Sequence, residues 1–114
     1  MVKYIPKQGD IIYLDFSQTI EEKGKRSALV ISNEIYNKFT NLTIVCPITS
    51  VIRDYPFHIV LPNNLKTKGV VMGEQLKAID YEKRNVRFFE KIDKSTLDNI
   101  LDVIMGFYED TSDE

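Results

Sequence analysis

Short runs of β-branched, aromatic and aliphatic residues recur along the first ninety residues, and Gly, Pro or Asn ends most of them within a few positions. Such spacing is typical of β-strands joined by tight turns. The runs occupy residues 10–16, 26–31, 43–49, 57–61, 70–72, 75–79 and 86–89. Since 114 residues are the size of one domain, we expect a single, mainly β domain over residues 1–114, built as a barrel or sandwich.

Three segments depart from the plain strand pattern. Residues 17–25 are polar and charged, which predicts an exposed loop. Asn33 can cap a short helical turn over residues 34–39, because its side-chain oxygen can accept from free backbone N–H groups. Pro47 cannot donate to a strand ladder, so we expect an edge or a bulge in the run 43–49.

The last segment has the period of a helix. Its apolar residues recur at spacings of three and four and form one stripe, made of Leu97, Ile100, Leu101, Ile104 and Tyr108. Asp93 or Ser95 can cap the N-terminus of such a helix. We therefore expect an α+β fold with a β majority and a C-terminal amphipathic helix packed on the strands.

Charge is unevenly distributed along the chain, whose net charge is −2. Residues 1–92 hold 14 of the 15 basic and 10 of the 17 acidic residues, a net charge of +4, whereas residues 93–114 carry −6. The basic residues cluster in and near the expected turns, as Lys23, Lys25, Arg26, Arg53, Lys66, Lys68 and Lys77. A solvated surface is the commoner meaning of such clusters, and a phosphate-binding face is the alternative.

The chain has one cysteine, Cys46, and one histidine, His58. An internal disulfide is therefore excluded, and a zinc site or a histidine-based triad is disfavoured, so we expect no metal and no cofactor. We expect Cys46 to be a buried hydrophobe and His58 to lie on the surface or in a groove. The apolar runs are too short for a membrane span and the N-terminus lacks a secretion signal, which predicts a cytoplasmic protein without a membrane partner.

Four segments carry a further pattern: residues 9–16 (GDIIYLDF), 24–33 (GKRSALVISN), 45–50 (VCPITS) with YPF at 55–57, and 69–79 (GVVMGEQLKAI). Taken in order, they resemble the MazF/PemK toxins, which are small endoribonucleases of bacterial type II toxin–antitoxin pairs. The likeness covers roughly residues 4 to 108. It implies an SH3-like β-barrel with a C-terminal helix, a homodimer, and a cognate MazE-like antitoxin that blocks the groove. It also implies metal-independent cleavage of single-stranded RNA (mRNA) that leaves 2′,3′-cyclic phosphate and 5′-hydroxyl ends.

Carried over residue by residue, the resemblance places the family's active arginine at Arg26 and its threonine at Thr49. A loop acid found in some members matches Glu21, the expected candidate for a general base. Position 27 departs from the family pattern, because Ser27 stands where proline is usual. Residues expected to contact RNA are Lys25, Ser50, Tyr55, Gln75 and Lys77, with Tyr13 and Phe57 as further aromatic faces for stacked bases.

The chemistry of these residue types suits RNA cleavage by its own 2′-hydroxyl. The transition state gathers negative charge on the phosphate oxygens, and the planar guanidinium of Arg26 stays charged and can donate two N–H groups to them. The hydroxyl of Thr49 can donate to the same phosphate. For the aromatic and polar candidates, packing in the core or pointing into solvent is the ordinary alternative.

Two other functions remain open from the sequence. The same barrel is used by CcdB-like proteins, which poison DNA gyrase through protein contact, although their functional helix end includes a tryptophan and this chain has none. A non-catalytic barrel that binds an antitoxin or nucleic acid is the other alternative.

Overall fold

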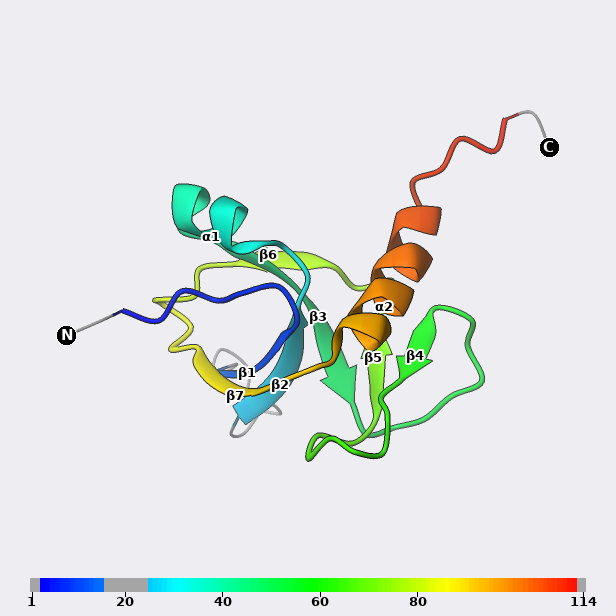
Figure 1. Cartoon of the computed structure of the whole chain (residues 1–114), viewed down its shortest axis with the longest axis horizontal. Coiled ribbons are helices and arrows are strands. Elements are labelled where there is room, and N and C mark those ends of the chain that lie inside the picture. The colour runs from blue at the N-terminus through cyan, green and yellow to red at the C-terminus, as the bar shows by residue number, and fades with distance from the viewer. Residues whose placement is uncertain (1–2, 16–24, 113–114) are drawn as a thin grey trace.

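The computed structural model describes residues 3–15 and 25–112 and shows a bent antiparallel sheet with two helices (Figure 1). The elements are β1 (Asp10–Asp15), β2 (Lys25–Val30), α1 (Glu34–Thr40), β3 (Thr43–Thr49), β4 (His58–Val60), β5 (Val70–Met72), β6 (Lys77–Ile79), β7 (Arg87–Lys91) and α2 (Lys94–Gly106). Strand neighbours follow the order β4-β5-β3-β2-β1-β7, and β6 also pairs with β3. The expected mainly β fold with a terminal helix is therefore what the chain forms.

The sheet curls so that its two ends meet through a side chain. β7 and β5 are far apart in the strand order, yet the Glu90 carboxylate of β7 accepts hydrogen bonds from the backbone N–H groups of Lys66 (3.1 Å) and Thr67 (2.7 Å), in the loop before β5. Within the described residues, the backbone ladders themselves leave the sheet open. The architecture is thus a barrel-like open sheet in which the Glu90 carboxylate links β7 to the loop before β5, a contact that we call the carboxylate clasp.

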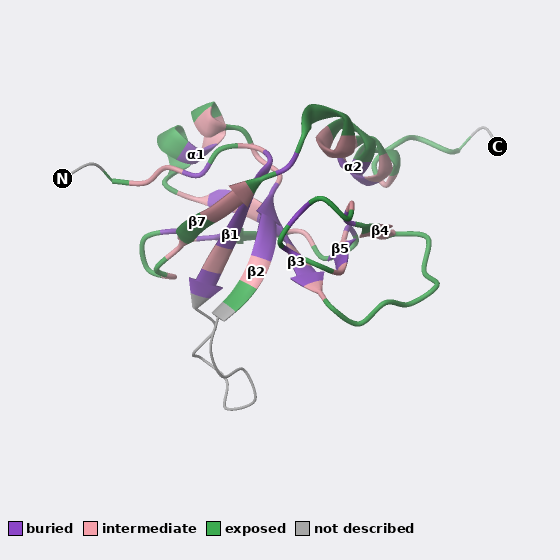
Figure 2. Ribbon diagram, turned by 60° about the horizontal axis from the view of Figure 1, so that its bottom comes forward, coloured by how far each residue is buried: buried purple, intermediate pink, exposed green. Residues whose placement is uncertain are grey.

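Apolar residues pack on both faces of the central strands (Figure 2). Alternate residues of a strand point to opposite faces, so one strand can supply two layers. One layer joins Ile11, Leu29 and Cys46 to Ile100 and Ile104 of α2. The other layer contains Ile12, Leu14, Ala28, Val30, Val45 and Ile79. Burial raises the pKa of Cys46 to about 12, so this thiol is the buried hydrophobe that the sequence predicts.

Both helices begin at a side-chain cap. The Asn33 side chain accepts from the backbone N–H of Tyr36 (2.9 Å), as expected. For α2 the cap is Asp93 and not Ser95, because the Asp93 carboxylate accepts from the backbone N–H of Thr96 (3.2 Å). Hydrogen bonds from Ser95 and Thr96 lower the pKa of Asp93 to about 2. Neither of the helices described reaches the length and apolar character that a membrane crossing needs.

Pro47 was expected to mark an edge or a bulge; it lies inside the sheet and not at its outer edge, at a gap in the pairing on one side of β3. β3 is central, pairing with β2 on one side and with both β6 and β5 on the other. Residues 43–45 pair with β6 and residues 48–49 pair with β5. Pro47 lies where β3 changes partner, so a residue without an N–H group is accommodated inside the sheet.

Some element boundaries also differ from the expectation. Lys25 starts β2 instead of ending the preceding loop, and Gln75 precedes β6 instead of lying within it. Tyr108 is 67% exposed and lies beyond the end of α2, so it is not part of the packed stripe. Ile100 and Ile104 of that stripe are buried as expected.

Candidate active site

Arg26 on β2 and Thr49 on β3 lie just beyond the last pair of the β2–β3 ladder. Ala28 pairs with Pro47 in this ladder. Continuing the same antiparallel register by two residues reaches Arg26 on β2 and Thr49 on β3. Ala28 and Pro47 are opposite each other and share one face of the sheet. Arg26 and Thr49, each two positions farther along its strand, lie on that same face.

Arg26 and Thr49 line one cavity of about 420 Å³. Its other described lining residues are Tyr13, Ser27, Ile48, Ser50, Val51 and Lys68. Two cations and four hydroxyl-bearing residues from neighbouring chain segments therefore surround the space, and the set of lining residues described includes no carboxylate. Such a set of donors suits a phosphate.

The end of β3, which carries Thr49, is held closely by the neighbouring chain. Thr49 Oγ1 accepts a hydrogen bond from the backbone N–H of Val51 (3.2 Å), which leaves its hydroxyl proton to be donated elsewhere. On the other side Gly69 has a φ of +123°, and a Cβ built there would lie 2.1 Å from the Thr49 carbonyl oxygen. Only glycine allows β5 to approach β3 so closely at this point.

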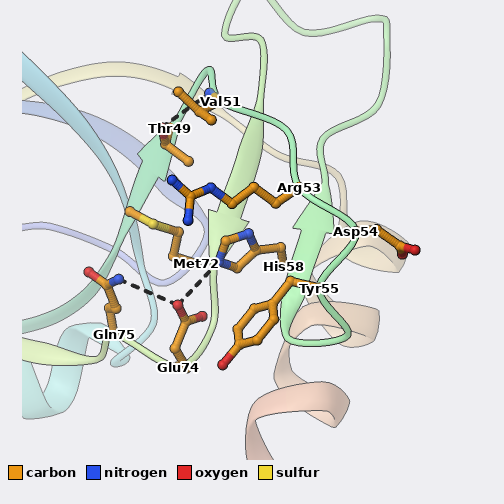
Figure 3. Close-up of a pocket in the computed structure, with 9 residues that line it drawn as sticks. All are labelled: Thr49, Val51, Arg53, Asp54, Tyr55, His58, Met72, Glu74 and Gln75. Carbon is orange, nitrogen blue, oxygen red and sulfur yellow. Dashed lines mark hydrogen bonds and ion pairs between the residues drawn. The ribbon is translucent and has the colours of Figure 1, made fainter.

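A second cavity of about 610 Å³ adjoins the first at the end of β3, since Thr49 and Val51 line both spaces. Figure 3 shows that the side chains of Arg53, Met72 and His58 converge in it. Its remaining described lining residues are Asp54, Tyr55, Glu74 and Gln75. Aromatic, amide and charged groups together can stack on a nucleobase and bond to its edges.

His58 and Glu74 form a pair at the floor of this second cavity. His58 Nε2 lies 3.1 Å from Glu74 Oε2, and the His58 side chain is 8% exposed. Partial burial by itself raises the pKa of Glu74, but hydrogen bonds from its own backbone N–H, His58 and Gln75 outweigh that effect. The pKa of Glu74 is therefore below its ordinary value. Because an ionised carboxylate can only accept hydrogen bonds, Nε2 of His58 carries the proton and donates it to Glu74 as a hydrogen bond.

The structure brings together five of the eight expected site residues at these two cavities: Arg26, Thr49, Ser50, Tyr55 and Gln75. Lys77 lies in β6 opposite Val45 and lines neither cavity. Glu21 lies outside the described residues. For Lys25 the structure describes only the backbone at the start of β2.

Of the extra aromatic candidates, Tyr13 lines the Arg26 cavity and also packs against Phe89, with ring centroids 4.7 Å apart. Phe57 packs edge-on against Phe107 near the C-terminal end of α2, at 4.8 Å. Phe57 is nevertheless exposed, and it also packs edge-on against Tyr55, so it lies on the surface beside the second cavity and not in the core.

Sequence reasoning missed three residues as parts of the site: Arg53, Glu74 and Lys68. Arg53 and Lys68 belong to the basic clusters near turns, but spacing alone does not tell which lysine or arginine turns inward. Glu74 meets His58 from 16 positions away, across the β4–β5 pair. Among the described residues, no group of three or more His, Cys, Asp or Glu side chains is arranged to hold a metal ion.

Comparisons of the sequence with a family model and with known proteins point to the same family. Residues 7–108 match the model of the PemK-like, MazF-like toxins of type II toxin–antitoxin systems. The endoribonuclease toxin MazF of Escherichia coli (strain K12) is 36% identical over 84 residues, which are 72% of this chain and 75% of that protein. The endoribonuclease EndoA of Bacillus subtilis is 33% identical over 86 residues, 69% of this chain and 74% of that one.

Solved structures agree with the sequence matches. A MazE–MazF crystal structure from Deinococcus radiodurans superposes with a TM-score of 0.83 at 29% identity, covering 93% of this chain and 97% of that chain. A MazF crystal structure from the same organism gives a TM-score of 0.82 at 30% identity, covering 93% of this chain and 98% of the other. The barrel-like fold with a C-terminal helix is thereby confirmed, and the chain belongs to the PemK-like, MazF-like toxin family.

Proposed function

We propose that this protein is the toxin of a type II toxin–antitoxin pair and cleaves single-stranded RNA in a sequence-selective way. The observation that carries the proposal is the meeting of Arg26 and Thr49 in one cavity, in a chain of an endoribonuclease family. The Arg26 cavity holds the phosphate at the cut, and the second cavity holds neighbouring bases against Tyr55 and Gln75.

In the proposed reaction the 2′-oxygen of the RNA bonds to the adjacent phosphorus while the bond from phosphorus to the 5′-oxygen breaks. The 2′-hydroxyl gives up its proton and the leaving 5′-oxygen gains one, which yields a 2′,3′-cyclic phosphate and a 5′-hydroxyl. Arg26 stabilises the charge that develops on the phosphate oxygens, and Thr49 donates its hydroxyl to the same group. Glu21 stays our candidate for the base that takes the 2′ proton.

The test is to incubate the purified protein with a long single-stranded RNA in EDTA and to map the fragment ends. We expect discrete cuts with cyclic phosphate ends, which are lost when the nucleotide at the cut carries a 2′-deoxyribose. Arg26→Ala should lower kcat/KM by about a hundredfold or more, because one preorganised donor typically contributes on the order of 3 kcal/mol.

The control for this substitution is Arg84→Ala, since Arg84 lies in the turn between β6 and β7 and lines neither cavity. Equal cleavage by Arg26→Ala and wild type would show that the activity belongs elsewhere. Gyrase inhibition with intact RNA would favour the CcdB-like alternative.

We also propose a homodimer and a cognate antitoxin as partners, because relatives of this fold are solved as MazE–MazF complexes. Met105 (61% exposed) and Tyr108 (67% exposed) are apolar side chains at the C-terminal end of the chain that a second subunit could cover. Sedimentation of wild type and of the double variant Met105→Lys/Tyr108→Lys checks this: a dimer that persists unchanged in the variant would place the interface elsewhere.

A further inference from the structure

Lys68 is the second basic residue that lines the Arg26 cavity, and the proposed reaction gives it no role. It is exposed and lines the same space as Arg26, Thr49 and Ser50. We propose that Lys68 is a second cation of the RNA site and binds a backbone phosphate of the substrate next to the one at the cut. This inference rests on the proposed function and deepens it.

The backbone at Gly69 fixes where Lys68 begins. Gly69 has a φ of +123° and its Cα lies so close to Thr49 that an added Cβ would meet the Thr49 carbonyl oxygen at 2.1 Å. Val70, the next residue, pairs with Thr49 in the β3–β5 ladder. The backbone of Lys68 is therefore held next to the end of β3 that carries Thr49.

The charge of Lys68 is available to a ligand. Its ammonium group donates to the neutral carbonyl oxygen of Asn63 (2.9 Å), and it forms no ion pair with a carboxylate in the described part of the chain. No carboxylate is among the described residues that line its cavity. A phosphate can replace or share the Asn63 contact, because an ammonium group has three donors.

Lys66 provides a natural comparison two residues earlier. It is also exposed, but it lines neither of the two cavities that meet at Thr49. Its backbone N–H donates to the Glu90 carboxylate, and this hydrogen bond and the charge of Lys66 both help to lower the pKa of Glu90. The same loop thus places Lys66 near Glu90 and Lys68 in a cavity whose described lining residues include no carboxylate.

A binding experiment separates these roles. The probe is a single-stranded oligonucleotide that contains a mapped cut sequence with a 2′-deoxyribose at the cut, and its Kd is measured by fluorescence anisotropy at several KCl concentrations. Each lysine–phosphate contact adds about 0.7 to the slope of log K against log salt for a single strand. We expect Lys68→Gln to lower that slope by about this amount and to weaken binding several-fold at low salt.

The matched variant Lys66→Gln should leave the slope at the wild-type value, and Lys68→Arg should restore it. In cleavage of the all-ribose oligonucleotide, Lys68→Gln should raise KM with little change in kcat and with the same cut position. A lysine that only held the Asn63 carbonyl would change thermal stability and leave the salt slope untouched.

Equal slopes for Lys68→Gln, Lys66→Gln and wild type would overturn the inference while leaving the nuclease intact. Absence of RNA cleavage by wild type would instead count against the proposed function. In that case the salt slope is measured on a single-stranded oligodeoxynucleotide of arbitrary sequence, which needs no mapped cut, so the two failures are distinguishable.

Discussion

Glu90 shows how one ionised side chain can hold a small barrel together. Its carboxylate accepts from Lys66 N, Thr67 N and the Thr67 hydroxyl (2.6 Å). Partial burial raises the pKa of Glu90, but these hydrogen bonds and the charge of Lys66 outweigh it, so the pKa lies below its ordinary value. The ionised form therefore stabilises the folded chain more than the unfolded one.

We predict that Glu90→Gln lowers the free energy of unfolding at pH 7 by about 1 kcal/mol, since hydrogen bonds to a charged group weaken with the charge. A depressed folded pKa contributes stability above the ordinary pKa of 4.5, and this contribution disappears as pH falls through the lower folded value. Urea unfolding should thus show a difference in the free energy of unfolding between the two proteins at pH 7, and this difference should close as the pH falls below 4.5 and through the lower folded pKa.

The matched control is Glu82→Gln. Glu82 pairs with Lys3 at 2.7 Å, but both side chains are about half exposed (52% and 54%). Exposed ion pairs contribute little to the free energy of unfolding, so this variant should be nearly as stable as wild type. A Glu90→Gln variant as stable as wild type at pH 7 would mean that the clasp does not hold the barrel.

At the scale of elements, the contact between β3 and the start of β5 decides where Thr49 lies. We predict that Gly69→Ala lowers the free energy of unfolding by about 2 kcal/mol or more, because alanine is strained at a φ of +123° and its Cβ collides with the Thr49 carbonyl. Cleavage of RNA by the folded fraction should fall as well, since the strand end must move.

Gly106→Ala serves as the control for this substitution. It is the last residue of α2, and a Cβ there meets nothing within 4 Å. Alanine has the better helix propensity, so we expect unchanged or slightly higher stability and unchanged cleavage. Thermal melting and single-turnover cleavage measure both effects. Similar losses in the two variants would show that the Thr49 contact has no special role.

How far the elements follow from the sequence depends on the range of the interactions that form them. Period and capping predict α2 and the Asn33 cap, because these are local. The gap in the pairing beside Pro47 arises because β3 has two partners along one side, which no local pattern reveals. The His58–Glu74 pair and the inward position of Lys68 likewise depend on how β4, β5 and their loop fold back.

The site itself divides in the same way. Arg26 and Thr49 were expected from the family likeness, and the β2–β3 register explains why they meet. The approach of Gly69 to Thr49 could not be foreseen, since glycine at the end of a loop is ordinary in sequence, and only its positive φ and the collision that an added Cβ would make with the Thr49 carbonyl show its importance.

For the whole molecule, the separation of charge has a measurable consequence. The body, residues 1–92, carries a net charge of +4 and residues 93–114 carry −6. Residues 109–112 are exposed beyond the end of α2. An acidic segment next to a basic body repels RNA and lowers its local concentration near sites that bind any phosphate.

We predict that truncation after Tyr108, which removes Glu109, Asp110, Asp113 and Glu114, increases binding to RNA that lacks the cut sequence. The net charge of the chain then changes from −2 to +2. The increase in RNA binding should be largest at low salt, and it should vanish at salt concentrations where the screening length falls below about 10 Å. The four-residue substitution of these acids by Asn or Gln keeps the length and should behave like the truncation. Anisotropy titrations at low and high KCl measure it, and a salt dependence identical to that of the full chain would show that the acidic segment does not act on RNA.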